Sequence, residues 1–80
     1  PMSHVTVFLR TALFSLGGDN AHVPAGTMVL KGTLPGPEVT GSLALTVSEC
    51  LDLRGKSLAT DSISLILPMS KVDHILLTDA

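Results

Sequence analysis

The sequence predicts an all-β protein, and three observations support this prediction. Turn-forming residues recur at 17–20, 24–26, 35–37 and 54–56, too often to leave a clean helical window. Between these turns lie aliphatic and β-branched runs that alternate with period two, which is typical of half-buried strands. The chain has 80 residues, 45% hydrophobic and 15% charged, so it fits one domain (residues 1–80) and is not a disordered chain.

The first predicted strand covers residues 4–16 and begins with a clear alternation. Val5 and Val7 lie on one face of this segment. Phe8 and Phe14 lie on the other face, so the strand is either buried on both sides or bent midway. A long polar loop is expected to follow it.

The second predicted strand covers residues 27–34 and contains a glycine in its interior. Alternation places Met28, Leu30 and Leu34 on the same face as Gly32. A glycine inside a strand indicates strong curvature or the close approach of another backbone.

The third predicted strand covers residues 39–51 and shows the clearest alternation in the chain. Its apolar face carries Leu43, Leu45 and Val47. A hairpin turn follows, in which Gly55 supplies the positive φ that such turns require.

The fourth predicted strand, residues 58–67, ends at Pro68 because proline cannot donate to a central ladder. Its core face is aliphatic and consists of Ile63, Leu65 and Leu67. A single turn of helix is expected next, and residues 72–77 make the fifth strand.

Five strands connected in this way predict a small, strongly bent SH3-like barrel without a clear N-terminal helix. The order of connections is typical of that barrel: a long loop, a short turn, a tight hairpin and a single-turn connector. The OB-fold also has five strands, but it usually places a helix between its third and fourth strands. This chain has only the hairpin turn in that interval.

With its strands laid out, the chain resembles the Sm/LSm family of small ring-forming barrels. The resemblance extends over nearly the whole chain as a hydrophobic frame, and it implies a homo-oligomeric ring. The segments that carry it are residues 5–9, 29–34, 43–50 and 67–75.

The resemblance also implies an RNA site, from which this chain departs. Family members usually carry an aspartate and an asparagine before the third strand, an Arg-Gly pair after the fourth, and a side chain that stacks on a base. Here Ser42 falls near the asparagine position, and Pro68 and Met69 replace the Arg-Gly pair. No aromatic residue lies near either place, so the site lacks a stacking contribution of roughly 1–3 kcal/mol per base. For this chain the resemblance therefore implies the ring-forming barrel but not the RNA site.

In the family that the chain resembles, the fourth and fifth strands lie at an open edge. Both segments are apolar here, and an edge of this kind aggregates unless another subunit covers it. Head-to-tail pairing of such edges closes into a ring. The sequence therefore predicts a non-catalytic ring with a structural or scaffolding role. Its predicted subunit interface consists of Ile63, Leu65, Leu67, Val72, Ile75 and Leu77.

The charge of the chain argues against a strong nucleic-acid binder. Lys and Arg total 5 against 7 Asp and Glu, a net charge of -2, and no basic run is present to neutralise phosphates. The alternative function is a divergent ring that binds single-stranded RNA, or an acidic protein, through Lys31, Arg54 and Lys56. A solubilising turn is the simpler interpretation of the last two residues.

Catalytic, cofactor and metal sites are not expected from this sequence. His4, His22 and His74 lack the spacing of metal ligands. Cys50 is interpreted as a small buried apolar group. Pro1 is similar to the N-terminal proline base of tautomerases, but the turn residues that follow exclude the helix which that fold requires. An enzyme is therefore the remote alternative.

The sequence also carries expectations about location and membranes. No apolar run approaches the roughly 18 residues of a spanning helix, so a membrane is not expected among the partners. The first residues lack the basic region and apolar core of a signal peptide. The single cysteine, Cys50, excludes an internal disulfide framework. A cytoplasmic location is the resulting expectation.

Overall fold

A computed structural model describes residues 3–14, 23–34 and 41–78 of the chain. The described residues are all-β, as the sequence predicts, and form one antiparallel sheet of 6 strands with one short 3-10 turn. The elements are β1 (Ser3–Leu9), β2 (Val29–Leu34), β3 (Ser42–Leu51), β4 (Ser57–Ala59), β5 (Ile63–Pro68), η2 (Met69–Lys71) and β6 (Val72–Leu77).

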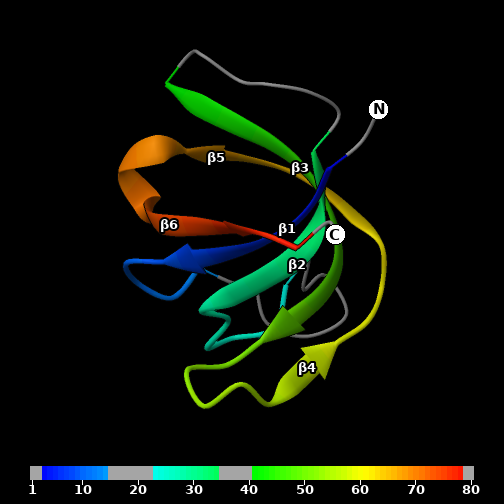
Figure 1. Cartoon of the computed structure of the whole chain (residues 1–80). Helices are drawn as coiled ribbons and strands as arrows, with labels where there is room; N and C mark the ends of the chain where they lie inside the picture. Colours follow the sequence, from blue (N-terminus) through cyan, green and yellow to red (C-terminus); the bar gives the residue numbers. More distant parts are fainter. Residues whose placement is uncertain (1–2, 15–22, 35–40, 79–80) are drawn as a thin grey trace.

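The strand order along the sheet is β4-β3-β2-β1-β6, and β5 also pairs with β3. The strands β4 and β5 use different parts of β3, because β4 pairs with Cys50 and Leu51 while β5 pairs with its first half. The sheet is open and strongly curved, and the chain turns from β5 through η2 into β6 (Figure 1).

The largest differences from the predicted strands concern two of them. The segment 58–67 is not continuous: β4 ends at Ala59 and β5 begins at Ile63, with three exposed polar residues between them. These residues are exposed to solvent and do not pair with another strand, so the predicted fourth strand is observed as two. The sheet therefore has six strands where five were expected. The first strand ends at Leu9 and not at residue 16.

The early end of β1 has a simple cause in its hydrogen bonds. After a register shift at Leu9, the Arg10 N–H donates to the Lys71 carbonyl, and the Leu13 N–H donates to the Thr27 carbonyl. These bonds replace the regular pairing of β1 with β2, so the strand ends here. Of the two alternatives for this strand, the bend is therefore the one observed. Phe14 lies beyond the bend with 81% of its surface exposed.

The glycine inside β2 lies against the backbone of β3, which confirms the close approach predicted for it. A Cβ atom added to Gly32 would overlap the Thr46 carbonyl oxygen and would lie 3.0 Å from the Val47 Cα. The register between the strands shifts at this point, and the Ser48 hydroxyl donates to the Lys31 carbonyl at 3.2 Å. The shift and the missing side chain let β2 and β3 curve together.

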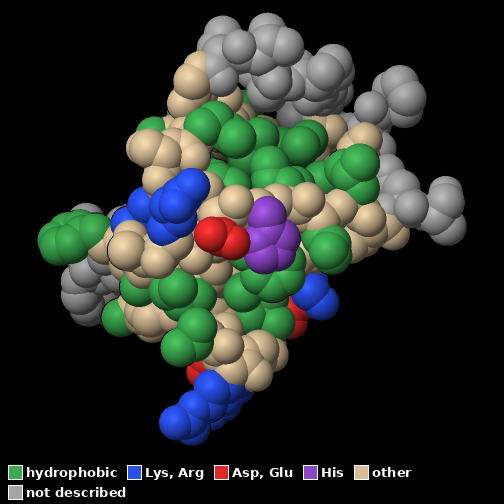
Figure 2. Space-filling view, turned by 60° about the vertical axis from the view of Figure 1, so that its left-hand side comes forward, with side chains coloured by type: hydrophobic (Ala, Val, Ile, Leu, Met, Phe, Trp, Pro, Cys, Tyr) green, Lys and Arg blue, Asp and Glu red, His purple; other side chains and the backbone are tan. Residues whose placement is uncertain are grey.

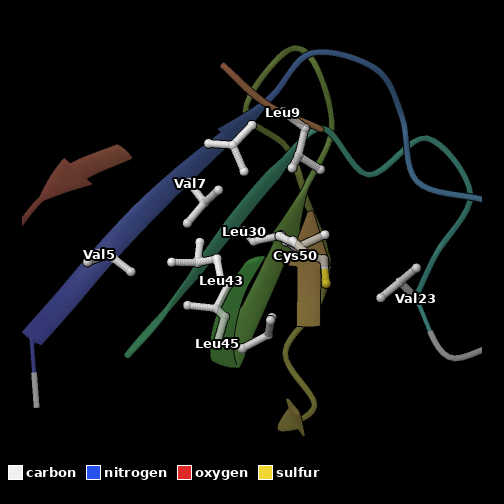
Figure 3. Packing of buried hydrophobic residues seen from close by; sticks show 11 residues of the cluster. Val5, Val7, Leu9, Val23, Leu30, Leu43, Leu45 and Cys50 are labelled. Atoms are coloured by element: carbon white, nitrogen blue, oxygen red, sulfur yellow. The ribbon is translucent and has the colours of Figure 1, made fainter. Parts of the chain in front are cut away.

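The core is aliphatic and is formed mainly by the inward faces of β1, β2 and β3 (Figure 3). The third strand follows its predicted alternation, because its predicted apolar face is buried. Val23, outside the strands, closes one end of the cluster and is 1% exposed. The buried members of the cluster are Val5, Val7, Leu9, Val23, Leu30, Leu43, Leu45, Val47, Cys50, Leu67 and Val72.

The predicted hairpin turn and the predicted single turn of helix are both observed. Gly55 has a φ of 85°, as the hairpin between β3 and β4 requires. The 3-10 turn η2 follows Pro68, where the sequence predicts the strand to end. Over the described residues, no helix has the length and apolar character needed to span a membrane.

Candidate functional site

Three surface features of the described chain are candidates for function. The first is a pair of open edges, on β5 and β6. Within the described residues, β5 pairs only with β3 and β6 pairs only with β1. In the described part of the chain, the second edge of each of these strands pairs with no other strand, and an uncovered edge is a template for pairing with another chain.

The open edges carry large apolar side chains on the surface. Ile66 of β5 is 74% exposed, and Leu77 of β6 is 70% exposed. Leu76 is 44% exposed beside it. The strand β5 (Ile-Ser-Leu-Ile-Leu-Pro) contains no charged residue that would keep another strand away. Exposed aliphatic side chains on an uncharged edge favour contact with a second protein surface.

The six predicted interface residues are divided between the core and the surface. Leu67 and Val72 are 3% and 5% exposed, so they belong to the core of one chain and leave almost no surface for another. Ile63, Leu65 and Ile75 are partly buried against the core. Leu77 alone is largely exposed.

Sequence reasoning missed Ile66 and Leu76 as candidates for this surface. Both lie at outward positions, where alternation leads one to expect polar residues. The signal was present in β5, since an isoleucine stands at a position of the strand that faces away from the core. Ile66 also lines a shallow hollow with Ala44, Thr46 and Ser64 of the β3–β5 pair.

The second feature is a pair of stacked rings, Phe8 and His74, which we call the ring pair. The two residues are cross-strand partners on β1 and β6, and their ring centroids lie 4.3 Å apart at an interplanar angle of 10°. His74 Nδ1 lies 2.7 Å from an Asp73 carboxylate oxygen, and the side chains of both residues are 55% exposed. A carboxylate at that nitrogen favours the tautomer with its proton on Nδ1, which leaves Nε2 as an acceptor.

Two cations lie near the ring pair, at the point where η2 leads into β6. Arg10 Nε donates to the Val72 carbonyl at 3.2 Å, and Lys71 Nζ donates to the Thr11 hydroxyl at 2.7 Å. Figure 2 shows a face on which basic, acidic and histidine side chains lie next to one another among hydrophobic ones. Sequence reasoning did not find this cluster, because only the β1–β6 pairing brings Phe8 and His74 together.

The predicted nucleic-acid residues lie in two places. Arg54 and Lys56 lie on the turn between β3 and β4 and are both exposed, as predicted. Lys31 lies within β2, opposite Glu49 of β3 in the strand register. It lines a separate hollow, whose other lining residues include His4 and Ser48.

The third feature is the turn at residues 52–56, which we call the hairpin tip. The Asp52 carboxylate accepts hydrogen bonds from the Arg54 and Lys56 N–H groups, each at 2.9 Å. The Gly55 N–H donates to the Asp52 carbonyl at 3.0 Å, and the Asp52 N–H donates to the Lys56 carbonyl at 2.9 Å. Four hydrogen bonds within five residues give this turn one conformation. It presents Leu53 with 79% of its surface exposed.

The two hydrogen bonds to the Asp52 carboxylate also lower its pKa. The N–H of Lys56 lowers the pKa of Asp52, and the N–H of Arg54 and the charges of both side chains act in the same direction. A lowered pKa means that the carboxylate stabilises the turn at neutral pH. This contribution is lost as the pH falls through the pKa of the folded state.

Asp52→Ala is therefore expected to loosen the hairpin tip without unfolding the sheet. Amide hydrogen exchange at Arg54 and Lys56 should become several-fold faster, because both groups lose their acceptor. In the wild-type chain the same loosening should occur only at acidic pH, below the ordinary range of aspartate. Asp61→Ala, on the exposed segment between β4 and β5, is the matched control, and equal exchange in both variants would contradict this account of the turn.

Cys50 is fully buried in β3 and is a free thiol. Burial raises the pKa of Cys50, and the Glu49 carboxylate raises it further, while a side-chain hydrogen bond with Thr27 acts against them. A raised pKa reduces the thiolate fraction at neutral pH, and the thiolate is the reactive form. This environment supports the interpretation of Cys50 as part of the core.

We expect the native chain to react slowly with a thiol reagent such as dithionitrobenzoate at neutral pH. Unfolding in urea should speed labelling by more than about 100-fold, because it exposes the thiol and returns its pKa to the ordinary value. Labelling of the native chain as fast as that of a Cys-containing unstructured peptide would show that Cys50 is accessible.

The remaining candidates lie apart or outside the described residues. Pro1 and His22 both fall outside them. His4 and His74 lie on different strands, β1 and β6. Over residues 3–14, 23–34 and 41–78, no group of three or more His, Cys, Asp or Glu side chains is placed to hold a metal ion.

Comparison with known proteins gave no match: no family model, curated protein or solved structure matches the chain. The described molecule is an all-β chain with two open edges, a ring pair and a rigid hairpin tip. Any inference about function therefore rests on the geometry of these three features.

Proposed function

We propose that the chain is a non-catalytic subunit of a homo-oligomeric ring with the Sm-like form of the SH3-like barrel, and that its role is structural or scaffolding. The observation that carries this proposal is the pair of open edges. Both edges present large exposed aliphatic side chains, Ile66 on β5 and Leu76 with Leu77 on β6. The edges belong to one chain, so each can be covered by the other edge of a second copy.

The arrangement of the strands supports the fold named in this proposal. The hairpin between β3 and β4 and the 3-10 turn between β5 and β6 lie where that barrel has its third and fourth connections. The order β4-β3-β2-β1-β6, with β5 on β3, leaves the last two strands at opposite ends of a curved sheet. These are the strands whose edges the resemblance implies to be open.

Covering the edges would contribute a useful free energy of association. Fully burying an aliphatic side chain contributes roughly 1.5–3 kcal/mol, so complete covering of the exposed parts of Ile66, Leu76 and Leu77 would contribute up to roughly 3–6 kcal/mol per contact. Main-chain hydrogen bonds between the two edges would add to this.

The two edges have different sequences, which determines the symmetry of the assembly. A contact of β5 with β6 of the next copy is head-to-tail and leaves one open edge of each kind. Head-to-tail contacts form a closed ring when the rotation between subunits closes, and a filament when it does not.

Light scattering coupled to size exclusion tests this proposal directly. We expect a single species at a small integer multiple of the 8.3 kDa chain mass, unchanged on dilution through the micromolar range. A monomer throughout that range would overturn the proposal. A continuous distribution of masses that grows with concentration would indicate open filaments in place of the ring.

A second candidate function is binding of single-stranded RNA, and the ring pair is the observation that favours it. Base stacking on an exposed ring beside cations is a common way of holding a single strand. Phe8 and His74 offer such a surface, with Arg10 and Lys71 nearby. The Asp73 carboxylate beside His74 repels phosphate, which is why this function ranks second.

Titration with oligo-U and mixed oligonucleotides at several salt concentrations tests the second candidate. If RNA is bound at the ring pair, Phe8→Ala should weaken binding roughly 10-fold, the value of one stacked base. If RNA is bound at the predicted cations, Arg54→Ala with Lys56→Ala should instead reduce the affinity and its salt dependence. No binding at low salt would exclude both sites.

A further inference from the structure

The hairpin tip combines properties that the proposed ring does not use. Leu53 is among the most exposed large apolar side chains in the described chain, at 79%, and it is followed directly by Arg54. Lys56 lies two residues further on, also exposed. Figure 2 shows basic side chains projecting from the lower end of the molecule, which is where Figure 1 places the turn that leads into β4.

The hydrogen bonds of the turn determine which groups remain for a partner. The N–H groups of Arg54, Gly55 and Lys56 all donate to Asp52. They are therefore not available to surround a phosphate, as backbone N–H groups do in an anion-binding loop. What the tip offers is one aliphatic side chain and the two cationic side chains on a rigid support, while the Asp52 carboxylate accepts the N–H groups of the turn.

These groups fit a lipid surface better than a nucleic acid or a folded protein. The turn has no aromatic ring on which a base could stack. Its five residues are far fewer than the 20–30 residues, or about 800 Å² per partner, of a stable protein interface. A bilayer surface needs no matching pocket, since its apolar boundary accepts an aliphatic side chain while cations contact the headgroups.

We propose that the hairpin tip docks on an anionic lipid bilayer, with Leu53 entering the headgroup boundary and with Arg54 and Lys56 contacting acidic headgroups. The expectation of no membrane partner rested on the lack of a long apolar run. Docking at the bilayer surface needs no spanning segment, so this proposal departs from that expectation. Each cation near an anionic surface strengthens binding about fivefold.

One tip binds weakly, and several tips on one assembly bind strongly. Cyclic symmetry places every copy of the tip at the same height along the ring axis. Binding of the first tip then raises the effective concentration of the others at the surface. The strength of docking in this respect rests on the proposed ring, whereas the choice of residues at the surface does not.

Cosedimentation with vesicles tests the proposal on the full chain. The vesicles are phosphatidylcholine alone, or phosphatidylcholine with phosphatidylserine at about one third of the lipid. We expect the wild-type chain to sediment only with the anionic vesicles, and to be released as the salt concentration rises. No sedimentation at low salt would overturn the proposal.

Variants of the tip locate the contact. Arg54→Glu with Lys56→Glu should lower the partition coefficient by more than about 25-fold, and Leu53→Ser should lower it about tenfold. Arg54→Lys keeps the charge and should retain binding. Phe14→Ser, which changes another highly exposed apolar residue, should also retain it. Equal binding by the wild-type chain and the tip variants would exclude the tip as the contact.

Light scattering on the same protein preparations, measured without vesicles, separates this proposal from that of the ring. A monomer that binds vesicles through Leu53 supports the tip and overturns the ring. A ring that ignores anionic vesicles supports the ring and overturns the tip. A monomer without vesicle binding overturns both, and binding of oligo-U by the tip in place of vesicles would assign it to RNA.

Discussion

Replacing Gly32 by alanine is expected to destabilise the protein strongly. The added Cβ atom would overlap the carbonyl oxygen of Thr46 and would lie 2.9 Å from its carbonyl carbon. Both are backbone atoms, so no side-chain rotation relieves the overlap, and β2 must move away from β3. The separation would break the hydrogen bonds between these strands and expose the core beneath them, at Leu30 and Val47.

The expected loss is about 4 kcal/mol or more, which is exceptional for a single substitution. A chain of 80 residues has a total unfolding free energy of about 4–12 kcal/mol. Urea denaturation followed by far-ultraviolet circular dichroism measures the difference. Gly41→Ala is the matched control, because a Cβ atom there meets nothing within 4 Å, and it should change stability by less than about 0.5 kcal/mol. Equal midpoints for the two variants would contradict the close approach of β2 and β3.

The local features of this fold were predictable from sequence because single residue types determine them. Leu43, Leu45 and Val47 occupy alternate positions, and only one face of a strand can be buried against the core. Gly55 was predictable because a tight hairpin requires a positive φ. Gly32 was predictable because a glycine inside a strand leaves space for a second backbone.

The features that depend on pairing between distant strands were not predictable from the sequence. The ring pair exists only because β6 pairs with β1, in a register that places Phe8 opposite His74. The exposure of Ile66 likewise depends on the outer face of the β3–β5 pair, which nothing in the described chain covers. Alternation gives the face on which a side chain lies, but whether that face is covered is a property of the whole fold.

Replacing Ile66 and Leu76 together by lysine is expected to dissociate the assembly. The two residues lie on the two open edges, β5 and β6, and are 74% and 44% exposed. The substitutions remove apolar contact area, and they place a charge on each edge, as natural edge strands do to prevent pairing. The lost contact area and the cost of covering the two charges weaken each contact by about 3 kcal/mol, or roughly 100-fold.

Size exclusion with light scattering should then show the chain mass of 8.3 kDa in place of the assembled mass. The sheet should remain folded, because both side chains project from its surface, and the circular dichroism spectrum and urea midpoint should be close to those of the wild-type chain. Leu53→Lys is the matched control: it places the same charge on a residue that is 79% exposed but lies on the hairpin tip, away from both edges. A ring built by pairing of β5 with β6 should therefore tolerate Leu53→Lys and dissociate with the edge variant. Dissociation by the control alone would instead place the subunit contact at the hairpin tip.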